Sequence, residues 1–160
     1  MKNAKNYSKS QISMLVILRV IIGWLFLYEG IVKLIDPTWS SIGYLMDSQG
    51  FMSGFYKSIA ANQGVLNAVD FMNIWGLIAI GLGLILGCFT RIAKIAGIVL
   101  LMMYYLSHPP FIGFDYNLPT EGNYLVVNKI LVELFTLALL LVFPTSNIIG
   151  LDRLIFKWKA

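Results

Sequence analysis

The chain has 160 residues, of which 58% are hydrophobic and only 12% charged, and its formal net charge is +4. A soluble domain carries about 25% charged residues, and a disordered chain is poor in apolar ones, so both classes are excluded. The basic residues are spread over both ends of the sequence and form no single patch, which argues against a nucleic-acid partner. A single cysteine, Cys88, excludes an internal disulfide. A single histidine, His108, excludes two-histidine haem ligation and most histidine-rich metal sites, so no metal site is expected.

Four apolar stretches are long enough to cross a membrane as helices. A span needs about 20 mostly apolar residues to cross a hydrocarbon core roughly 30 Å thick. The predicted spans cover residues 13–35, 71–89, 91–107 and 123–143. Proline cannot continue a helix, and Pro37, Pro109 and Pro144 end three of the four stretches. The sequence therefore predicts one all-α domain, an integral membrane four-helix bundle that takes up the whole chain.

The distribution of basic residues predicts the orientation of these spans. They precede the first span, lie in the turn between the second and third, and follow the fourth: Lys2, Lys5, Lys9, Arg91, Lys94, Arg153, Lys157 and Lys159. An even number of spans places all of these on one side, and the opposite side holds only Lys57. Since cytoplasmic loops are enriched in lysine and arginine, both termini are predicted to be cytoplasmic, and membrane lipid is the expected partner of the spans.

The two loops on the outer side are unusually rich in aromatic residues. The first, residues 36–70, is too apolar for a free loop and is predicted to form short interfacial helices at the membrane surface. The second, residues 108–122, contains three prolines and three aromatic residues. Together the two loops are expected to form a lid over the outer ends of the helices.

Local signals in the second and third spans predict how they pack. Gly76, Gly83 and Gly87 fall on one helix face, and small residues allow close approach of helices in lipid, so they are predicted to form a packing seam. Thr90 stands at the start of the third span, where a threonine is a preferred N-cap residue.

Five ionisable residues lie inside predicted spans, although a charge at the bilayer centre costs at least about 2.5–3.5 kcal/mol. Arg19, Glu29 and Lys33 are in the first span, and Lys129 and Glu133 are in the fourth. The last two residues of each group are four apart and share a helix face. A rise of about 1.5 Å per residue places Glu29 and Lys129 about 9 Å below the outer surface, and Glu133 near the middle. The spacing predicts a chain of alternating charge, Lys33, Glu29, Lys129 and Glu133, between spans one and four, which Arg19 extends inward.

This charged cluster has two interpretations. It is either a set of structural ion pairs that fix which helices are neighbours, or a polar pocket that binds an anion or a quinone head group or relays protons. His108 also has two interpretations: a histidine at the end of the third span suits the helix dipole, and the alternative is a role in a pocket or a proton relay.

Several motifs along the chain resemble those of a known family. They are LRVIIGWLFLYEGIVK at 18–33, DPTW with GYL at 36–45, NIWG running on to FTR at 73–91, YYLSHP at 104–109, EGNYLVVNKILVE at 121–133 and GLD at 150–152. The chain resembles the DoxX/DoxD membrane-protein family, and within it the DoxD branch. The resemblance implies a four-helix fold in a prokaryotic cytoplasmic membrane.

The resemblance also implies a function. DoxD is a subunit of thiosulfate:quinone oxidoreductase and works with a second subunit, DoxA. The chain is therefore expected to be a membrane subunit of a quinone-linked oxidoreductase, in which thiosulfate is the candidate substrate, quinone the co-substrate and a DoxA-like protein the partner. It is expected to carry no cofactor of its own. The expected ligand-binding residues are the five span charges with His108: Arg19, Glu29, Lys33, Lys129, Glu133 and His108.

Two other classes of function remain open on the sequence. One is a non-enzymatic scaffold or assembly subunit of a cell-envelope complex. The other is a small transporter or lipid-binding protein that holds an anionic head group in the charged cleft. The sequence alone therefore leaves open whether the chain is an enzyme.

Overall fold

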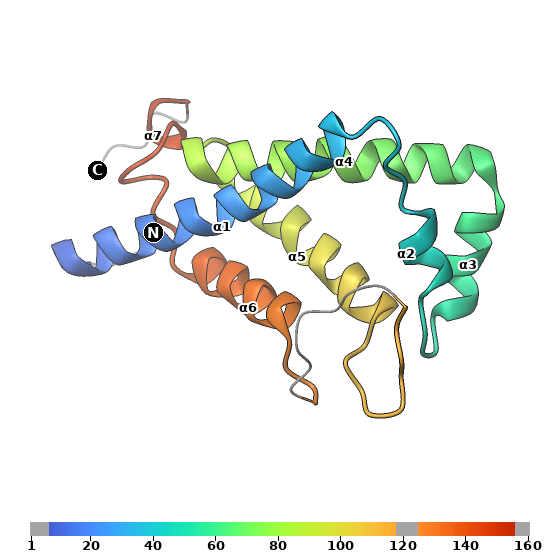
Figure 1. The fold of residues 1–160 in the computed structure, drawn as a ribbon. Helices are drawn as coiled ribbons and strands as arrows, with labels where there is room; N and C mark the ends of the chain where they lie inside the picture. Colours follow the sequence, from blue (N-terminus) through green and yellow to red (C-terminus); the bar gives the residue numbers. More distant parts are fainter. Residues whose placement is uncertain (1–6, 118–124, 156–160) are drawn as a thin grey trace.

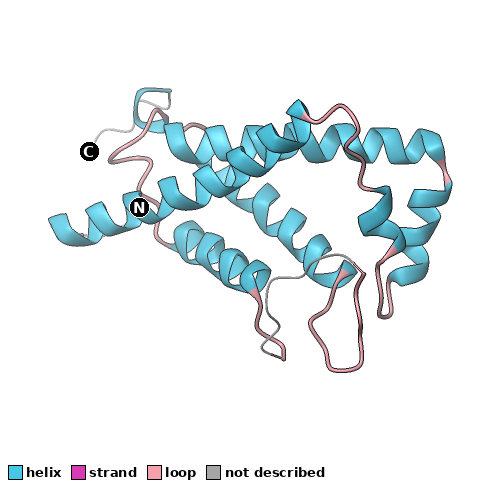
Figure 2. Ribbon diagram, in the orientation of Figure 1, coloured by secondary structure: helices cyan, strands magenta, loops and turns pink. Residues whose placement is uncertain are grey.

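The computed structural model of the chain describes residues 7–117 and 125–155, and all regular structure in these two ranges is helical. The long helices are α1 (Lys9–Ile35), α4 (Gln63–Leu86), α5 (Thr90–Ser107) and α6 (Lys129–Val142). The short ones are α2 (Ile42–Met46), α3 (Ser53–Ala61) and α7 (Asp152–Ile155). The described part of the chain contains no strand (Figure 2), which confirms the predicted all-α class.

Successive long helices run in opposite directions along the bundle (Figure 1). The start of α1, the α4–α5 turn and α7 lie at one end, which is called the inner end below. The short helices α2 and α3 and the loop after α5 lie at the other, the outer end. In the part of the chain that the structure describes, α1, α4 and α5 are each long and apolar enough to cross a membrane. The fold is that of a multi-pass membrane protein.

The fourth long helix is shorter than the predicted span. Helix α6 has 14 residues, a length of about 21 Å, whereas the predicted span covers 123–143. It begins at Lys129 because the side chain of Asn128 caps it, accepting a hydrogen bond from the backbone N–H of Leu131 at 3.0 Å. Residues 123 and 124 of the predicted span lie outside the described ranges.

Helix α4 differs from the second predicted span, 71–89, at both ends. Helix α4 already begins at Gln63, because the side chain of Asn62 accepts hydrogen bonds from the N–H groups of Gly64 and Val65 at 3.1 and 3.2 Å. It ends before Gly87, whose φ of +69° is left-handed and is the usual way for glycine to stop a helix. The first of the two outer loops is correspondingly shorter than predicted.

Helices α1 and α4 pack closely against each other. The contact depends on glycine at position 81, where a Cβ atom would lie 2.5 Å from the backbone nitrogen of Leu27 and 2.8 Å from the carbonyl oxygen of Gly23. The predicted glycine seam of Gly76, Gly83 and Gly87 does not include Gly81, the glycine at this contact. A Cβ at Gly76 would meet nothing within 4 Å, and one at Gly83 would face Ala93 of α5 at 3.2 Å.

Two hydrophobic clusters stabilise the fold. The larger one lies among the four long helices and includes Phe26, Leu77, Leu84 and Leu137. The smaller one, which includes Tyr56, joins α2 and α3 to the start of α4. The Tyr56 hydroxyl also donates a hydrogen bond of 2.8 Å to the carbonyl of Met103 in α5. The first outer loop thus forms short helices, as predicted, and they pack on the ends of α4 and α5.

Candidate functional site

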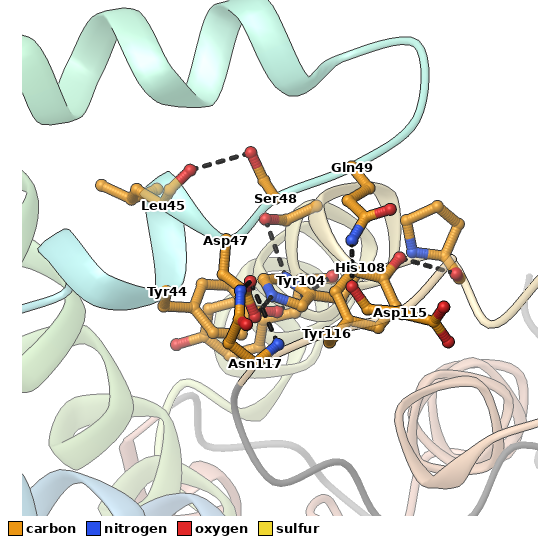
Figure 3. A network of polar contacts seen from close by, with 12 residues as sticks. Tyr44, Leu45, Asp47, Ser48, Gln49, Tyr104, His108, Asp115, Tyr116 and Asn117 are labelled. Carbon is orange, nitrogen blue, oxygen red and sulfur yellow. Dashed lines mark hydrogen bonds and ion pairs between the residues drawn. The ribbon is translucent and has the colours of Figure 1, made fainter. Parts of the chain in front are cut away.

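His108 follows directly after the last residue of α5, and only 7% of its surface is exposed. Its imidazole lies against two aromatic rings (Figure 3). The ring of Tyr44 from α2 stacks on it at 3.9 Å between centroids and an interplanar angle of 28°. The ring of Tyr116, from the second outer loop, lies at 4.6 Å and 35°. Pro109 and Pro110 end the helix here and turn the chain toward that loop.

The two ring nitrogens of His108 have different surroundings. Nδ1 lies 3.1 Å from the hydroxyl oxygen of Ser107. Nε2 faces the carboxylate of Asp47 at 3.8 Å, which is beyond hydrogen-bond length, and it has no hydrogen-bond partner. The Asp47 side chain, also 7% exposed, accepts hydrogen bonds from the backbone N–H and the side-chain amide of Asn117 at 3.2 and 2.8 Å. A buried imidazole and a buried carboxylate therefore face each other within 4 Å.

Burial sets the protonation states of this group. It lowers the pKa of His108 below 6.5, although the nearby Asp47 carboxylate acts in the opposite direction. Burial raises the pKa of Tyr44, and burial together with Asp47 raises that of Tyr116 to about 12. At neutral pH the imidazole is uncharged and both phenols carry their protons. One of the two imidazole nitrogens is then free of a proton and can accept one.

The polar contacts continue from Tyr44 into the outer half of the bundle. The Tyr44 hydroxyl donates a hydrogen bond of 3.1 Å to the carbonyl of Tyr104. The Tyr104 hydroxyl accepts a hydrogen bond from the amide nitrogen of Asn73 at 2.8 Å. The amide oxygen of Asn73 is buried without a hydrogen-bond partner. Buried polar atoms are nearly always satisfied, so this one requires an explanation.

Lys33 joins the same region from α1. Its ammonium nitrogen lies 5.3 Å from the ring centroid of Trp39 and 5.8 Å from that of Tyr104, within the range of cation–π attraction. It also lies 3.7 Å from the carboxylate of Glu29, which confirms the predicted i, i+4 pairing in the first span. The group defined by these contacts is called the outer polar cluster: Glu29, Lys33, Tyr44, Asp47, Asn73, Tyr104, Ser107, His108, Tyr116 and Asn117.

The two outer loops are bonded to each other across this cluster. The backbone N–H of Gln49 donates a hydrogen bond of 3.2 Å to the carbonyl of Ser107, and its side-chain amide bonds the carbonyl of Asp115. The Tyr116 hydroxyl donates to the carbonyl of Pro109 at 2.8 Å. The described part of the second loop therefore packs with the first over the end of α5, as the predicted lid requires (Figure 3).

The charged residues that were predicted to form a chain between the first and fourth spans lie on α1 and α6, and these two helices pack mainly on other helices. Helix α1 packs mainly on α4, and α6 packs mainly on α5. Lys129 is the first residue of α6, whereas the predicted span places it six residues after the start of its helix. Its depth of about 9 Å below the outer surface stays a prediction. Glu133 follows one turn later on α6. A continuous chain of alternating charge from Lys33 to Glu133 stays a prediction.

Arg19 belongs to a separate cluster at the inner end. Its side chain is 3% exposed and donates to the hydroxyl of Thr145 at 3.3 Å and the carbonyl of Ile149 at 2.9 Å. Lys94, predicted to be a basic residue of the turn, is buried instead and donates to the carbonyl of Leu140, near the end of α6, at 3.1 Å. Both cations satisfy carbonyls at or after the end of α6, where cations are favourable.

The inner cluster also corrects the predicted cap of the third span. Thr90 is the first residue of α5, and its side chain does not cap the helix. The Asp152 carboxylate caps α5 instead, accepting hydrogen bonds from the N–H of Phe89 at 2.7 Å, and from the N–H and hydroxyl of Thr90 at 3.2 and 2.7 Å. This cap comes from the far end of the chain, so no local pattern around Thr90 could have indicated it.

Sequence reasoning did not single out several members of the outer polar cluster as site residues. These are Tyr44, Asp47, Asn73, Tyr104 and Tyr116. Two weak signals were present. Asn73 is the only side-chain amide in the predicted span 71–89, and Asp47 is an acidic residue in a markedly apolar loop. Their convergence depends on the packing of α2 on the end of α5, which no local pattern encodes.

Apolar helices that cross a membrane, with polar clusters buried at both ends, define the protein as a multi-pass integral membrane protein. The DoxX family model matches residues 14–109. Since this match covers more than half of the chain, the protein belongs to the DoxX family. The matched region ends just after His108 and so contains most of the outer polar cluster. No curated protein and no solved structure matches the chain.

Proposed function

We propose that this protein is a DoxD-like membrane subunit of a quinone-linked oxidoreductase, and that the quinone head group binds in the outer polar cluster. One observation carries the proposal. Among the described residues, three buried side-chain polar atoms lack a hydrogen-bond partner. Two of them, the amide oxygen of Asn73 and Nε2 of His108, lie in the outer polar cluster. A site that binds a ligand through hydrogen bonds leaves such atoms unsatisfied when the ligand is absent.

The chemistry of the cluster suits this ligand. A quinone head group is a flat ring with an oxygen at each end, and flat rings stack favourably on aromatic side chains such as Tyr44 and Tyr104. The hydroxyl groups of the reduced form donate hydrogen bonds, and an amide oxygen accepts them. Nε2 of His108 is also an acceptor when Nδ1 carries the proton and donates to Ser107. The apolar tail would remain beside the exposed apolar faces of the helices.

The electrons would come from a partner, because the single cysteine of the chain cannot form a dithiol couple. The resemblance to DoxD favours a DoxA-like subunit as this partner and thiosulfate as the electron donor. Lys33 is the cation of the outer polar cluster and would attract the anionic donor toward the head group.

Equilibrium binding to the purified protein in lipid nanodiscs tests the proposal. The probes are short-tailed ubiquinol and menaquinol analogues, and quenching of tryptophan fluorescence reports binding. We expect saturable binding that Asn73→Leu weakens by about tenfold, because a buried hydrogen bond contributes about 1–2 kcal/mol. Asn67→Leu is the matched control, since Asn67 is an exposed residue of the same helix.

Two outcomes would contradict this function. One is the absence of saturable binding for both analogues. The other is binding that Asn73→Leu leaves unchanged. Either would favour a scaffold of an envelope complex or a transporter of lipids or anions over a quinone-linked subunit.

A further inference from the structure

We propose that the outer polar cluster exchanges protons with the outer end of the bundle only, through His108 and Asp47. The role of these protons in quinone chemistry rests on the function proposed above. The route itself rests on the positions of side chains in this chain and can be tested without quinone.

The route begins at the tyrosines that would meet the head group. The ring of Tyr44 stacks on the imidazole of His108 at 3.9 Å, and the Ser107 hydroxyl lies 3.1 Å from Nδ1 of the same imidazole. An imidazole can accept a proton at one nitrogen and release another from its second nitrogen. Nε2 faces Asp47, which is bonded in turn to Asn117 on the exposed part of the second outer loop. The Ser107 hydroxyl, the His108 imidazole and the Asp47 carboxylate thus follow one another from the end of α5 toward the surface.

The widest step in this series is the 3.8 Å between Nε2 of His108 and Asp47. A hydrogen bond between a nitrogen and an oxygen is about 2.9 Å long, so a displacement of less than about 1 Å completes it. The imidazole is stacked on Tyr44 and lies beside Tyr116, so in-plane sliding costs little contact with their rings. The titratable groups that face His108 are Asp47 and Tyr44 from the α2 segment and Tyr116 from the second loop. The ring of Tyr104, from α5, packs edge-on against the ring of Tyr44.

No comparable route leads inward through the described residues. Directly below the outer polar cluster lies the larger hydrophobic cluster, which includes Phe26, Leu77 and Leu101. The next titratable residue down α5 is Lys94, ten positions before Tyr104 and therefore about 15 Å away along the helix. Its ammonium bonds a carbonyl of α6, below the hydrophobic cluster. Since α1, α4 and α5 contribute apolar side chains to this layer, we expect exchange to proceed toward the outer end.

The presence of a single histidine makes a direct test possible. The chain without a histidine tag, labelled with ¹⁵N-histidine, gives imidazole signals from His108 alone, and these report its protonation. The protein is reconstituted in liposomes whose interior is held at about pH 7.5. The external pH is then lowered to about 5, well below the ordinary histidine pKa of about 6.5. The orientation of the protein in the liposomes is measured in a Cys88→Ser, Ser58→Cys variant, whose single cysteine lies at an exposed position of α3. A membrane-impermeant maleimide labels only those molecules whose α3 faces outward, and the labelled fraction of molecules gives the orientation.

We expect the protonated fraction of His108 to rise when the external pH is lowered, and to rise in proportion to the fraction of molecules whose α3 faces outward. Asp47→Asn should slow the response at least about tenfold, as expected for the loss of a proton-transfer group. The matched control, Asp115→Asn, changes an exposed aspartate of the second outer loop and should leave the rate unchanged.

Three results would overturn the route. The first is protonation of His108 that follows the internal pH or is the same for both orientations. The second is a histidine that responds to neither side. The third is a rate that Asp47→Asn does not alter. Because no quinone is present, these results are independent of the binding assay with Asn73→Leu, so the route and the proposed function can fail separately.

Discussion

Thr90 and Asp152, which are 62 residues apart in the sequence, are joined by two hydrogen bonds at the inner end of the bundle. The same carboxylate accepts a hydrogen bond from the N–H of Phe89, whose φ of +47° is unusual for a residue with a side chain. The backbone N–H of Asp152 donates in turn to the carbonyl of Gly87 at 2.8 Å. The segment after α6 thus holds the tight α4–α5 turn in its left-handed conformation.

Replacement of this carboxylate should destabilise the protein. Asp152→Ala removes the acceptor of three hydrogen bonds at the start of α5, and we expect a loss of about 1–3 kcal/mol in the free energy of unfolding. The measurement is thermal unfolding in detergent micelles, followed by intrinsic fluorescence. Asp115→Ala, at an exposed aspartate, should change the midpoint little. Equal shifts in the two variants would contradict the structural role of Asp152.

The contribution of Asp152 should also depend on pH. Burial raises its pKa, but the hydrogen bonds from the Thr90 hydroxyl and the N–H groups of Thr90 and Phe89 outweigh this, so the pKa lies below 3.8. The stabilisation is therefore complete above pH 3.8 and is lost as the pH falls through the lowered pKa. Thermal unfolding between about pH 5 and pH 3 should show this acid loss in the wild type and a smaller one in Asp152→Ala.

Gly81→Ala should separate α1 from α4. The added methyl would lie 2.5 Å from the backbone nitrogen of Leu27, and a backbone cannot yield as the end of a side chain does. Overpacking of this kind costs about 1–3 kcal/mol, so the unfolding midpoint should fall clearly. Gly76→Ala is the control on the same helix, because its methyl would meet nothing within 4 Å. If both alanine variants were equally stable, the close α1–α4 contact would be wrong.

His108 should make the stability of the protein depend on pH near neutrality. Because burial lowers its pKa below 6.5, the unfolded chain binds a proton there more readily than the folded one. Its contribution is fully present above pH 6.5 and falls as the pH drops toward the lowered pKa. We expect the unfolding midpoint to decrease between about pH 7.5 and pH 5.5, and the decrease to be smaller in His108→Gln. The same pH slope in both proteins would show that another group titrates.

Asp70→Ala should loosen the connection between α1 and α2. The Asp70 side chain accepts hydrogen bonds from the hydroxyl of Ser40 at 2.8 Å, the N–H of Ser41 at 3.0 Å, and the Ser41 hydroxyl. We expect a loss of about 1–3 kcal/mol and faster amide hydrogen exchange at residues 36–41. Asn67→Ala, one turn earlier on α4 and exposed, should leave exchange at these residues unchanged. Unaltered exchange in Asp70→Ala would show that these bonds do not hold the connection.

The sequence predicted those parts of the fold that depend on local signals. Helices α1 and α5 end two residues before Pro37 and Pro109, as the prolines predict. The Glu29–Lys33 pair follows from helical spacing alone. The start of α4 was missed, because the Asn62 cap precedes several residues that are not strongly apolar. The start of α6 was missed for a related reason: Asn128 starts this helix later than hydropathy indicates.

The candidate site was predicted only in part, because it combines residues from five segments. Glu29, Lys33 and His108 were expected and do lie in the outer polar cluster, but Arg19 lies at the other end of the bundle. Tyr44 and Asp47 reach His108 only through the packing of α2 on the end of α5. A charge in a span is visible in the sequence, whereas the partner that satisfies it is set by tertiary packing.

The short length of α6 has a consequence for the surrounding lipid. Its 14 residues extend about 21 Å, against a typical hydrocarbon thickness of about 30 Å. A bilayer adapts to such hydrophobic mismatch by thinning locally, at a fraction of a kcal/mol per Å. The leaflet beside the start of α6 would then be depressed, and lipid head groups and water would reach down to Lys129. The molecule would fit better into a membrane of short acyl chains, and its surroundings would be asymmetric, with a shallow side at α6 and a full-depth side at α1 and α4.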